Sequence, residues 1–242
     1  MVIVILGTGD AFSAERAGSS ALVVGPEGQV LIDAPDAIMR VLAEASARSG
    51  VRIGPGTIDD ILITHIHGDH VNGLEAIGFW RWLEKRSSGR PLPRLHTIPE
   101  VAARLWERLA PAMDQGGTAT LADYFEVRVL PRDAAARIAG LEVRHRMGVH
   151  SVPVCGFLIS DGRRTFGWSG DTAWVPEHVQ WLAQADFFVH ETSAPPTHTP
   201  IEHLNALPAS TKSRMALVHI PDGFDPEQTG IRVLSDGERI EI

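Results

Sequence analysis

Short apolar runs recur along the chain and predict its strands. Each is four to seven residues long, rich in β-branched or aromatic residues, and most are bounded by turn-forming residues, which is typical of β-strands. The runs lie at 1–6, 21–24, 30–33, 61–64, 125–130, 141–147, 154–160, 165–169, 187–190 and 215–219. The chain is therefore expected to contain many short strands in both of its halves.

Residues 36–49 have a different period, which is that of an amphipathic helix. The apolar residues of one helical face are Ile38, Val41, Leu42 and Ala45. Gly50 follows as a stop signal, and a second helix is expected to begin near Val71. Because helices and strands are interleaved along the chain, we expect an α/β fold in which helices cover two packed sheets.

We expect residues 1–242 to form a single domain with two similar halves, about 1–130 and 131–242. Residues 78–117 differ from the rest and are interpreted as a helical insertion. The large side chains of this segment are Phe79, Trp80, Trp82, Trp106 and Met113. We favour a role for them in the core at helical spacing; the alternative is a cap over a pocket or a dimer contact.

Charge and composition narrow the choice of partners. The chain carries 30 acidic against 22 basic residues, a formal charge of −8. Nucleic acid binding requires a basic face that neutralises phosphates. The one local group of basic residues is thin and is interpreted as a solvated face; it comprises Arg81, Lys85, Arg86, Arg90 and Arg94. We therefore do not expect nucleic acid as a partner.

The single cysteine, Cys155, excludes an internal disulfide framework and a cysteine-rich zinc ribbon, which favours a reducing compartment. The first apolar run meets Gly7 after six residues, too early for a signal peptide or a membrane span. No apolar stretch approaches the roughly twenty residues that cross a bilayer. A cytoplasmic protein without a membrane span is the expectation.

Three histidines and an aspartate follow one apolar run directly. The run that starts at Ile61 leads into His65-Ile-His67-Gly-Asp69-His70. Residues two apart in extended backbone point to the same side, so His65 and His67 can grip one metal ion. The glycine permits a tight turn, after which Asp69 and His70 face a second position. The alternative is a helix capped by Asp69 with solvated histidines, which three histidines behind a buried strand disfavour.

This motif resembles the hallmark of the metallo-β-lactamase superfamily, and other segments extend the resemblance over nearly the whole chain. Residues 149–153 resemble the third-histidine motif, 168–172 the strand end that presents a bridging aspartate, and 217–221 the last histidine. Residues 6–11 and 31–34 are similar to the opening strands. The resemblance implies a four-layer αββα sandwich, here with a helical insertion.

The resemblance also implies a set of seven metal ligands. The first ion would bind His65, His67 and His150, the second would bind Asp69, His70 and His219, and Asp171 would bridge the two. Imidazole and carboxylate ligands suit two divalent ions, zinc in the first place, with manganese or iron as alternatives. Cys155 does not occupy the position of the cysteine ligand of true lactamases, which argues against antibiotic hydrolysis.

Two further segments resemble the branch that contains ribonuclease Z and the cyclic phosphodiesterases. They are His190-Glu191-Thr192 and Glu202-His203-Leu-Asn. By this resemblance His203 would contact a phosphoryl oxygen or protonate the leaving oxygen, and Glu191 would orient its ring. The alternative is that Glu191 ends a strand at the surface and His203 begins a helix. The remaining candidates, His96, His178 and His198, show no partner pattern and are interpreted as surface or loop residues, and His145 as a core residue.

Two departures separate the chain from known members of that branch. Only twenty residues lie between His150 and Asp171, which leaves no room for the long basic arm by which ribonuclease Z proteins grip tRNA. A single cysteine also cannot build the additional zinc site of the phosphonate-pathway phosphodiesterases. Processing of tRNA is therefore not expected.

The function expected from these features is metal-dependent hydrolysis. A hydroxide shared by two ions, which Asp69 can orient, would attack a small phosphodiester or cyclic phosphate. The alternative is hydrolysis of a carboxylic ester, thioester or lactone with the same ligands; a non-catalytic metal-binding scaffold is disfavoured by the full ligand set. The expected partner is a small anionic substrate, and the resemblance also allows a homodimer.

Overall fold

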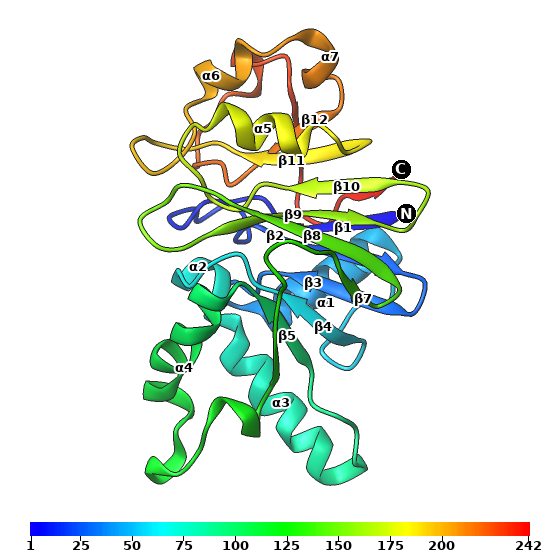
Figure 1. The fold of residues 1–242 in the computed structure, drawn as a ribbon, viewed down its shortest axis with the longest axis vertical. Coiled ribbons are helices and arrows are strands. Elements are labelled where there is room, and N and C mark those ends of the chain that lie inside the picture. Colours follow the sequence, from blue (N-terminus) through cyan, green and yellow to red (C-terminus); the bar gives the residue numbers. More distant parts are fainter.

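The computed structural model describes residues 1–242 and contains two seven-stranded sheets (Figure 1). The strands of the first sheet are β1 (Val2–Gly7), β2 (Ser20–Gly25), β3 (Gly28–Ile32), β4 (Ile58–Leu62), β5 (Arg94–Thr97), β6 (Glu126–Val129) and β14 (Arg239–Glu241). Those of the second are β7 (Ala136–Ile138), β8 (Leu141–Met147), β9 (Cys155–Ser160), β10 (Thr165–Trp168), β11 (Phe187–Glu191), β12 (Met215–Val218) and β13 (Arg232–Val233). Their spatial orders are β14-β1-β2-β3-β4-β5-β6 and β13-β12-β11-β10-β9-β8-β7.

Helices cover the outer faces of both sheets (Figure 1). The helices on the side of the first sheet are α1 (Ile38–Ser49), α2 (Gly68–Val71), α3 (Gly73–Ser88) and α4 (Pro99–Met113). Those on the side of the second are α5 (Pro176–Leu182), α6 (Ile201–Asn205) and α7 (Ala209–Lys212). Short 3₁₀ turns lie at Gln115–Gly117, Leu121–Asp123 and Pro226–Gln228. The four-layer αββα arrangement is confirmed, and no helix is both long and apolar enough to cross a membrane.

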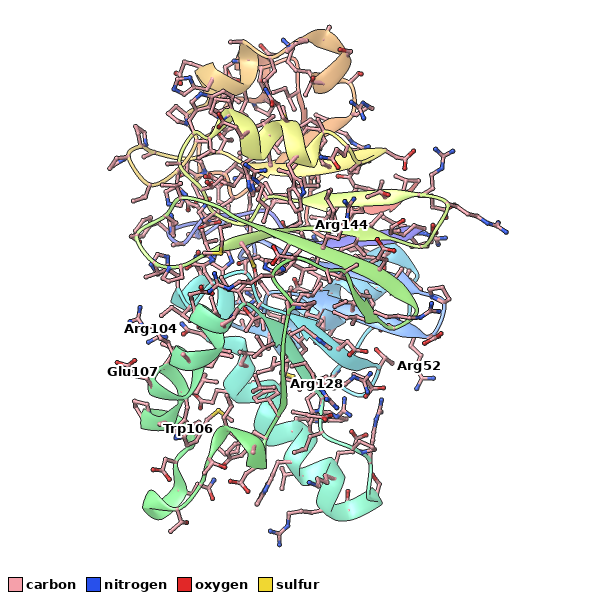
Figure 2. The ribbon with its side chains drawn as sticks, viewed as in Figure 1. Arg52, Arg104, Trp106, Glu107, Arg128 and Arg144 are labelled. Carbon is pink, nitrogen blue, oxygen red and sulfur yellow. The ribbon has the colours of Figure 1, made fainter.

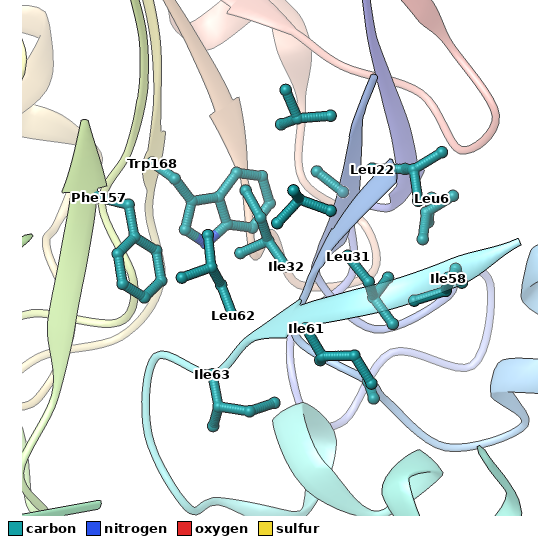
Figure 3. Close-up of a cluster of buried hydrophobic side chains, with 14 of the residues drawn as sticks. Leu6, Leu22, Leu31, Ile32, Ile58, Ile61, Leu62, Ile63, Phe157 and Trp168 are labelled. Atoms are coloured by element: carbon teal, nitrogen blue, oxygen red, sulfur yellow. The ribbon is translucent and has the colours of Figure 1, made fainter. Parts of the chain in front are cut away.

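The facing surfaces of the two sheets share one hydrophobic core. Side chains alternate across β4, so Leu62 points toward Phe157 and Trp168 of the second sheet while Ile61 points to the opposite side (Figure 3). All four of these side chains are almost completely buried. The packing of both sheets on one core fixes the edges of the two sheets relative to each other.

Parallel strands in both sheets bring their carboxyl ends to one edge. Strands β3 to β6 are parallel to one another in the first sheet, and β10 to β13 are parallel in the second. Loops that follow such strands form the usual binding crevice of an α/β fold. The loops after β3, β4, β10, β11 and β12 therefore define the place to look for a site.

The chain passes from the first sheet to the second between β6 and β7, close to the expected boundary near residue 130. One strand departs from this division, because β14 returns to the first sheet and pairs antiparallel with β1. The two termini consequently meet, and the Met1 amino group donates a hydrogen bond to the Ile242 carbonyl oxygen at 2.9 Å.

The segment 78–117 is not purely helical, which corrects the sequence interpretation. It contains the end of α3, the strand β5 and the helix α4, and β5 lies between β4 and β6. The rings of Phe79, Trp82 and Trp106 surround the buried Tyr124 with centroid distances of 5.4, 6.5 and 6.5 Å. These three aromatic residues are partly buried and pack against the core, while Arg104 of α4 points outward (Figure 2).

Arg81 does not lie on a solvated face, and that expectation was wrong. Its side chain is fully buried, and its guanidinium donates hydrogen bonds to the backbone oxygens of Ile58 and Pro91 and to the Asp59 carboxylate. The guanidinium thereby ties α3 to the start of β4 and to the segment that precedes β5. Lys85, one turn further along the helix, is exposed as expected.

Candidate functional site

All seven residues expected to bind metal meet at the carboxyl edge of the two sheets. They form two groups whose ligand atoms lie within 4.8 Å of one another. The first group is His65, His67 and His150, and the second is Asp69, His70, Asp171 and His219. They are presented by the loops that follow β4, β8, β10 and β12. Residues far apart in sequence are thus brought together by the arrangement of the strands.

The first group consists of three imidazoles. His150 Nε2 lies 3.1 Å from His67 Nδ1, and His65 Nε2 lies 3.7 Å from Asp171 Oδ2. The His150 ring is fixed from behind, because its Nδ1 donates a hydrogen bond to the Thr197 carbonyl oxygen at 2.9 Å. That bond leaves Nε2 directed at the other imidazoles, which is the arrangement of a metal-binding histidine.

The second group is centred on Asp171. Its Oδ2 atom lies 3.3 Å from His70 Nε2 and 3.1 Å from His219 Nε2. Asp69 Oδ2 lies 3.1 Å from His70 Nε2 and 3.4 Å from His219 Nε2. Asp171 thus adjoins both groups, the position that a bridging carboxylate requires.

Asp33 supports the ligands from behind, and we did not single it out from the sequence. Its Oδ2 lies 2.8 Å from His70 Nδ1, and its Oδ1 accepts a hydrogen bond from the Thr64 N–H at 2.8 Å. Thr64 Oγ1 in turn lies 2.9 Å from His65 Nδ1. A carboxylate behind a ligating histidine orients the ring and raises its basicity. The position of Asp33 directly after β3 could have indicated this role.

The expected ligand His219 and the supporting residue Asp33 stand in the left-handed backbone region that non-glycine residues rarely adopt. The φ angle is 58° at Asp33 and 55° at His219, and each residue directly follows or nearly follows a buried strand. Such backbone conformations persist where the surrounding structure imposes them, and they cluster at functional sites.

The donor set fits metal ions by two observations. The Nε2 atoms of His65 and His70 are buried and have no hydrogen-bond partner, which is costly unless a further group satisfies them. Burial holds the pKa of His65 well below its usual value, so its ring is neutral, which is the form that binds metal. Although burial opposes it, the Asp171 and Asp33 carboxylates raise the pKa of His70. Their negative charge favours a positive charge at this position, either a proton on the His70 ring or a bound metal ion.

Glu191 pairs with His198, which corrects the expected pairing with His203. Glu191 is buried at the end of β11, and its Oε2 lies 3.5 Å from His198 Nδ1. Its other oxygen, Oε1, accepts hydrogen bonds from the Thr172 and Thr199 N–H groups at 3.0 and 2.9 Å. The His198 ring stacks on His219 at 4.9 Å between centroids, so it borders the metal ligands.

His203 lies outside this cluster. Its ring is exposed on α6 and stacks on Trp174, with 5.0 Å between centroids and 7° between planes. His203 and His198 are both in the segment that follows β11, and sequence position alone did not separate them. The two histidines differ in position because the Thr199 N–H donates a hydrogen bond to Glu191, which holds the neighbouring His198 beside the ligands.

The other histidines behave differently from what the sequence indicated. His178 is fully buried on α5, where its Nε2 donates to the Ser169 carbonyl oxygen at 3.0 Å, and His96 is nearly buried with its Nε2 2.7 Å from Asp60 Oδ1. Neither is a surface residue. His145 is half-buried on β8 and does not belong to the metal-binding groups.

Comparison with known proteins places this site in a family. Residues 1–236 match the family described as Anti-Pycsar protein Apyc1. The Anti-Pycsar protein Apyc1 of Paenibacillus sp. (strain J14) is 32% identical over 232 residues, which cover 91% of this chain and 89% of that protein. The family match includes every strand except β14 and every loop that carries an expected ligand.

Two further relatives describe the wider group. The cGMP-dependent 3′,5′-cGMP phosphodiesterase A of Dictyostelium discoideum is 24% identical over 97% of this chain, which spans only 27% of that longer protein. The metallo-β-lactamase fold protein YhfI from Bacillus subtilis superposes with a TM-score of 0.76 at 13% identity, covering 99% of this chain and 98% of its own. The metallo-β-lactamase fold expected from the sequence is confirmed. Because the family match spans residues 1–236 and a member is 32% identical over nearly the whole chain, the chain belongs to the Anti-Pycsar protein Apyc1 family.

Proposed function

We propose that the protein hydrolyses 3′,5′-cyclic nucleotides with two divalent metal ions held by the seven ligands. The substrate class is supported by the Dictyostelium relative, whose name states this chemistry and whose similarity extends over 97% of the chain. The observation that carries the proposal is the His198 ring, which stacks on His219 and faces Glu191 at the border of both ligand groups. A phosphodiester has two non-bridging oxygens besides its leaving oxygen, so the metal ions and this histidine could contact it at the same time.

The ligands would hold the ions in the two groups described above. Divalent ions there would polarise a phosphoryl oxygen and lower the pKa of water to about 7, which supplies a nucleophile at neutral pH. We favour zinc, with manganese or iron as alternatives, because imidazole and carboxylate ligands suit all three. Asp69, which is partly exposed, is placed to orient the attacking water.

His198 would act on the leaving group. Hydrolysis adds water to phosphorus and breaks one P–O ester bond, so the departing oxygen must gain a proton. With Nδ1 of His198 facing Glu191, its Nε2 remains for a phosphoryl oxygen or for the leaving oxygen. Glu191 is fixed by two backbone N–H groups, and its role is to position the ring.

The charge of the site agrees with an anionic substrate. The protein has a net charge of −8, and Asp69 and Asp171 add negative charge within the site itself. Bound divalent ions would be the largest local charges and would reverse this balance. We therefore expect a cyclic phosphate to bind only when the metal site is loaded.

The test is hydrolysis by purified protein supplied with zinc or manganese. Cyclic GMP, cyclic AMP, p-nitrophenyl acetate and a simple lactone are each supplied as substrate at the same concentration. The products are followed by chromatography. The expected result is phosphodiester cleavage that disappears with a chelator and returns with metal. Turnover of the ester or lactone at higher kcat/KM than either cyclic nucleotide would overturn the proposal.

A further inference from the structure

Phe12 is the most exposed large apolar side chain, with 90% of its surface open to solvent. It lies in the loop 8–19 between β1 and β2. Single exposed apolar residues are common on protein surfaces, so exposure alone assigns no role to Phe12. Its role is inferred from the hydrogen bonds that hold its loop and from the position of that loop.

The loop is held firmly by aspartates from three segments. Asp10 Oδ1 accepts a hydrogen bond from the Phe12 N–H at 3.0 Å. Asp222 accepts one from the Ala14 N–H at 2.7 Å, and Asp236 accepts one from another backbone N–H of the loop at 2.8 Å. Each aspartate fixes a different point of the loop. The ring of Phe12 is therefore exposed on a well-supported turn and not on a loose one.

The same loop packs against the segments that carry the metal ligands. The Asp10 N–H donates to the carbonyl oxygen of Ile220, the residue after His219, at 3.2 Å. A Cβ atom added to Gly18 would lie 3.2 Å from the Asp69 carbonyl oxygen, which shows how close the two backbones are. In Figure 1 the dark blue segment after β1 lies at the same end of the sheets as α2.

Asp10 also connects the loop to the segment of His198. Its Oδ2 lies 3.5 Å from the Ser193 hydroxyl, while its Oδ1 accepts from the Phe12 N–H. One buried carboxylate thus links the backbone of Phe12 to the segment 192–200 on which His198 stands. The loop that carries Phe12 therefore borders the segments of Asp69, His219 and His198 at the rim of the ligand cluster.

We propose that Phe12 is a substrate-binding residue that stacks on the nucleobase of the substrate. This inference rests on the proposed hydrolysis of cyclic nucleotides. In such a substrate the ribose separates the base from the phosphate, so a base whose phosphate lies at the ligands extends to the rim of the site. A fixed, exposed aromatic ring at that rim gives the base a flat partner without hydrogen bonds, so purine and pyrimidine bases are both accepted.

The test compares substrates with and without a base. The variants are Phe12→Ala and Phe12→Trp, with Leu83→Ala as matched control, because Leu83 is 59% exposed on α3. The substrates are cyclic GMP and 1-O-methylribose 3,5-cyclic phosphate, which has the same phosphodiester and no base. Base stacking on an aromatic side chain corresponds to a change of about 5-fold to 150-fold in affinity.

The expected result is a KM for cyclic GMP that rises within that range in Phe12→Ala, with kcat nearly unchanged. The KM for the base-free substrate stays the same, Phe12→Trp retains the wild-type KM, and Leu83→Ala changes neither. Equal effects on both substrates, or no effect on cyclic GMP, would overturn the stacking role while leaving cyclic nucleotide hydrolysis intact. Absence of cyclic GMP hydrolysis by the wild-type protein would overturn both proposals.

Discussion

Glu191 Oε2 lies 3.5 Å from His198 Nδ1, although His203 is the histidine that the sequence suggested as its partner. The carboxylate is buried and its other oxygen is already fixed by two backbone N–H groups, so it has one oxygen left for one ring. Burial also raises the pKa of Glu191. The two histidines lie five residues apart, and their contrast gives a direct experiment.

Replacement of His198 by alanine should lower kcat for cyclic nucleotides about 10²-fold to 10⁴-fold, the usual contribution of a positioned acid or base. His203→Ala should keep kcat within a factor of about two, because its exposed ring stacks on Trp174 away from the ligands. Steady-state kinetics with metal-loaded proteins measures both. An equal loss in the two variants would contradict the assignment of His198.

Glu191→Gln gives a second measure of the same pair. The amide keeps one oxygen for the Thr172 and Thr199 N–H groups but presents an N–H to the His198 ring in place of an acceptor. The ring would then lose the partner that holds it in its present orientation. We expect kcat to fall while metal content is unchanged, as measured by elemental analysis; loss of metal with activity in proportion would argue for a ligand role instead.

Four of the seven expected ligands form a local sequence pattern, because His65, His67, Asp69 and His70 lie within six residues. The other three, His150, Asp171 and His219, were identified only by resemblance, and each lies in a loop that follows a strand ending at the same edge. His198 was not predictable, because its place depends on a hydrogen bond between Thr199 and Glu191 that no spacing reveals. The sequence offers two histidines at that point, and only the structure shows that His198 is the one beside Glu191.

The strand β5 was missed for a similar reason. Its residues Arg94 and His96 read as polar surface, but both hydrogen-bond to Asp60, which is buried on the neighbouring strand β4. Burial alone would raise the pKa of Asp60, but the hydrogen bonds from Arg94 and His96 lower it to about 2. Polar residues that satisfy one another can occupy a sheet without any apolar alternation, and the pairing is visible only after folding.

Asp33→Asn should weaken metal binding without removing a ligand. The asparagine amide can replace one oxygen toward Thr64, but an N–H facing His70 Nδ1 would favour the wrong tautomer of that ring. Loss of such a supporting carboxylate typically costs 10-fold to 100-fold in metal affinity. Titration with zinc in a competing chelator measures the change. Wild-type affinity in the folded variant would show that Asp33 has only a structural role.

Arg81→Ala should destabilise the protein by roughly 2–4 kcal/mol, since buried backbone oxygens that lose their donor cost about 1–3 kcal/mol each. The guanidinium now donates to the carbonyl oxygens of Ile58 and Pro91. Lys85→Ala on the exposed side of the same helix is the matched control and should change stability by less than about 0.5 kcal/mol. Urea denaturation of both variants measures the difference, and similar midpoints would contradict it.

Acid should destabilise the fold through two buried histidines. Burial lowers the pKa of His178 and His190 to about 4, against 6.5 for the unfolded chain. Between these values the unfolded chain binds more protons than the folded one, so stability falls as the pH falls from about 6.5 toward 4. At pH 5 the loss is on the order of 2 kcal/mol for each histidine relative to pH 7.

His178→Gln separates this effect from the loss of metal in acid. A glutamine can still donate to the Ser169 carbonyl oxygen, as His178 Nε2 does, but it does not titrate. Urea denaturation at pH 7 and pH 5, with a chelator in every sample, should show a smaller loss of stability in this variant than in the wild type. His203→Gln is the control, because the His203 ring is exposed and its removal leaves the buried pair unchanged. If both variants lose as much stability as the wild type, protonation of His178 does not limit the fold in acid.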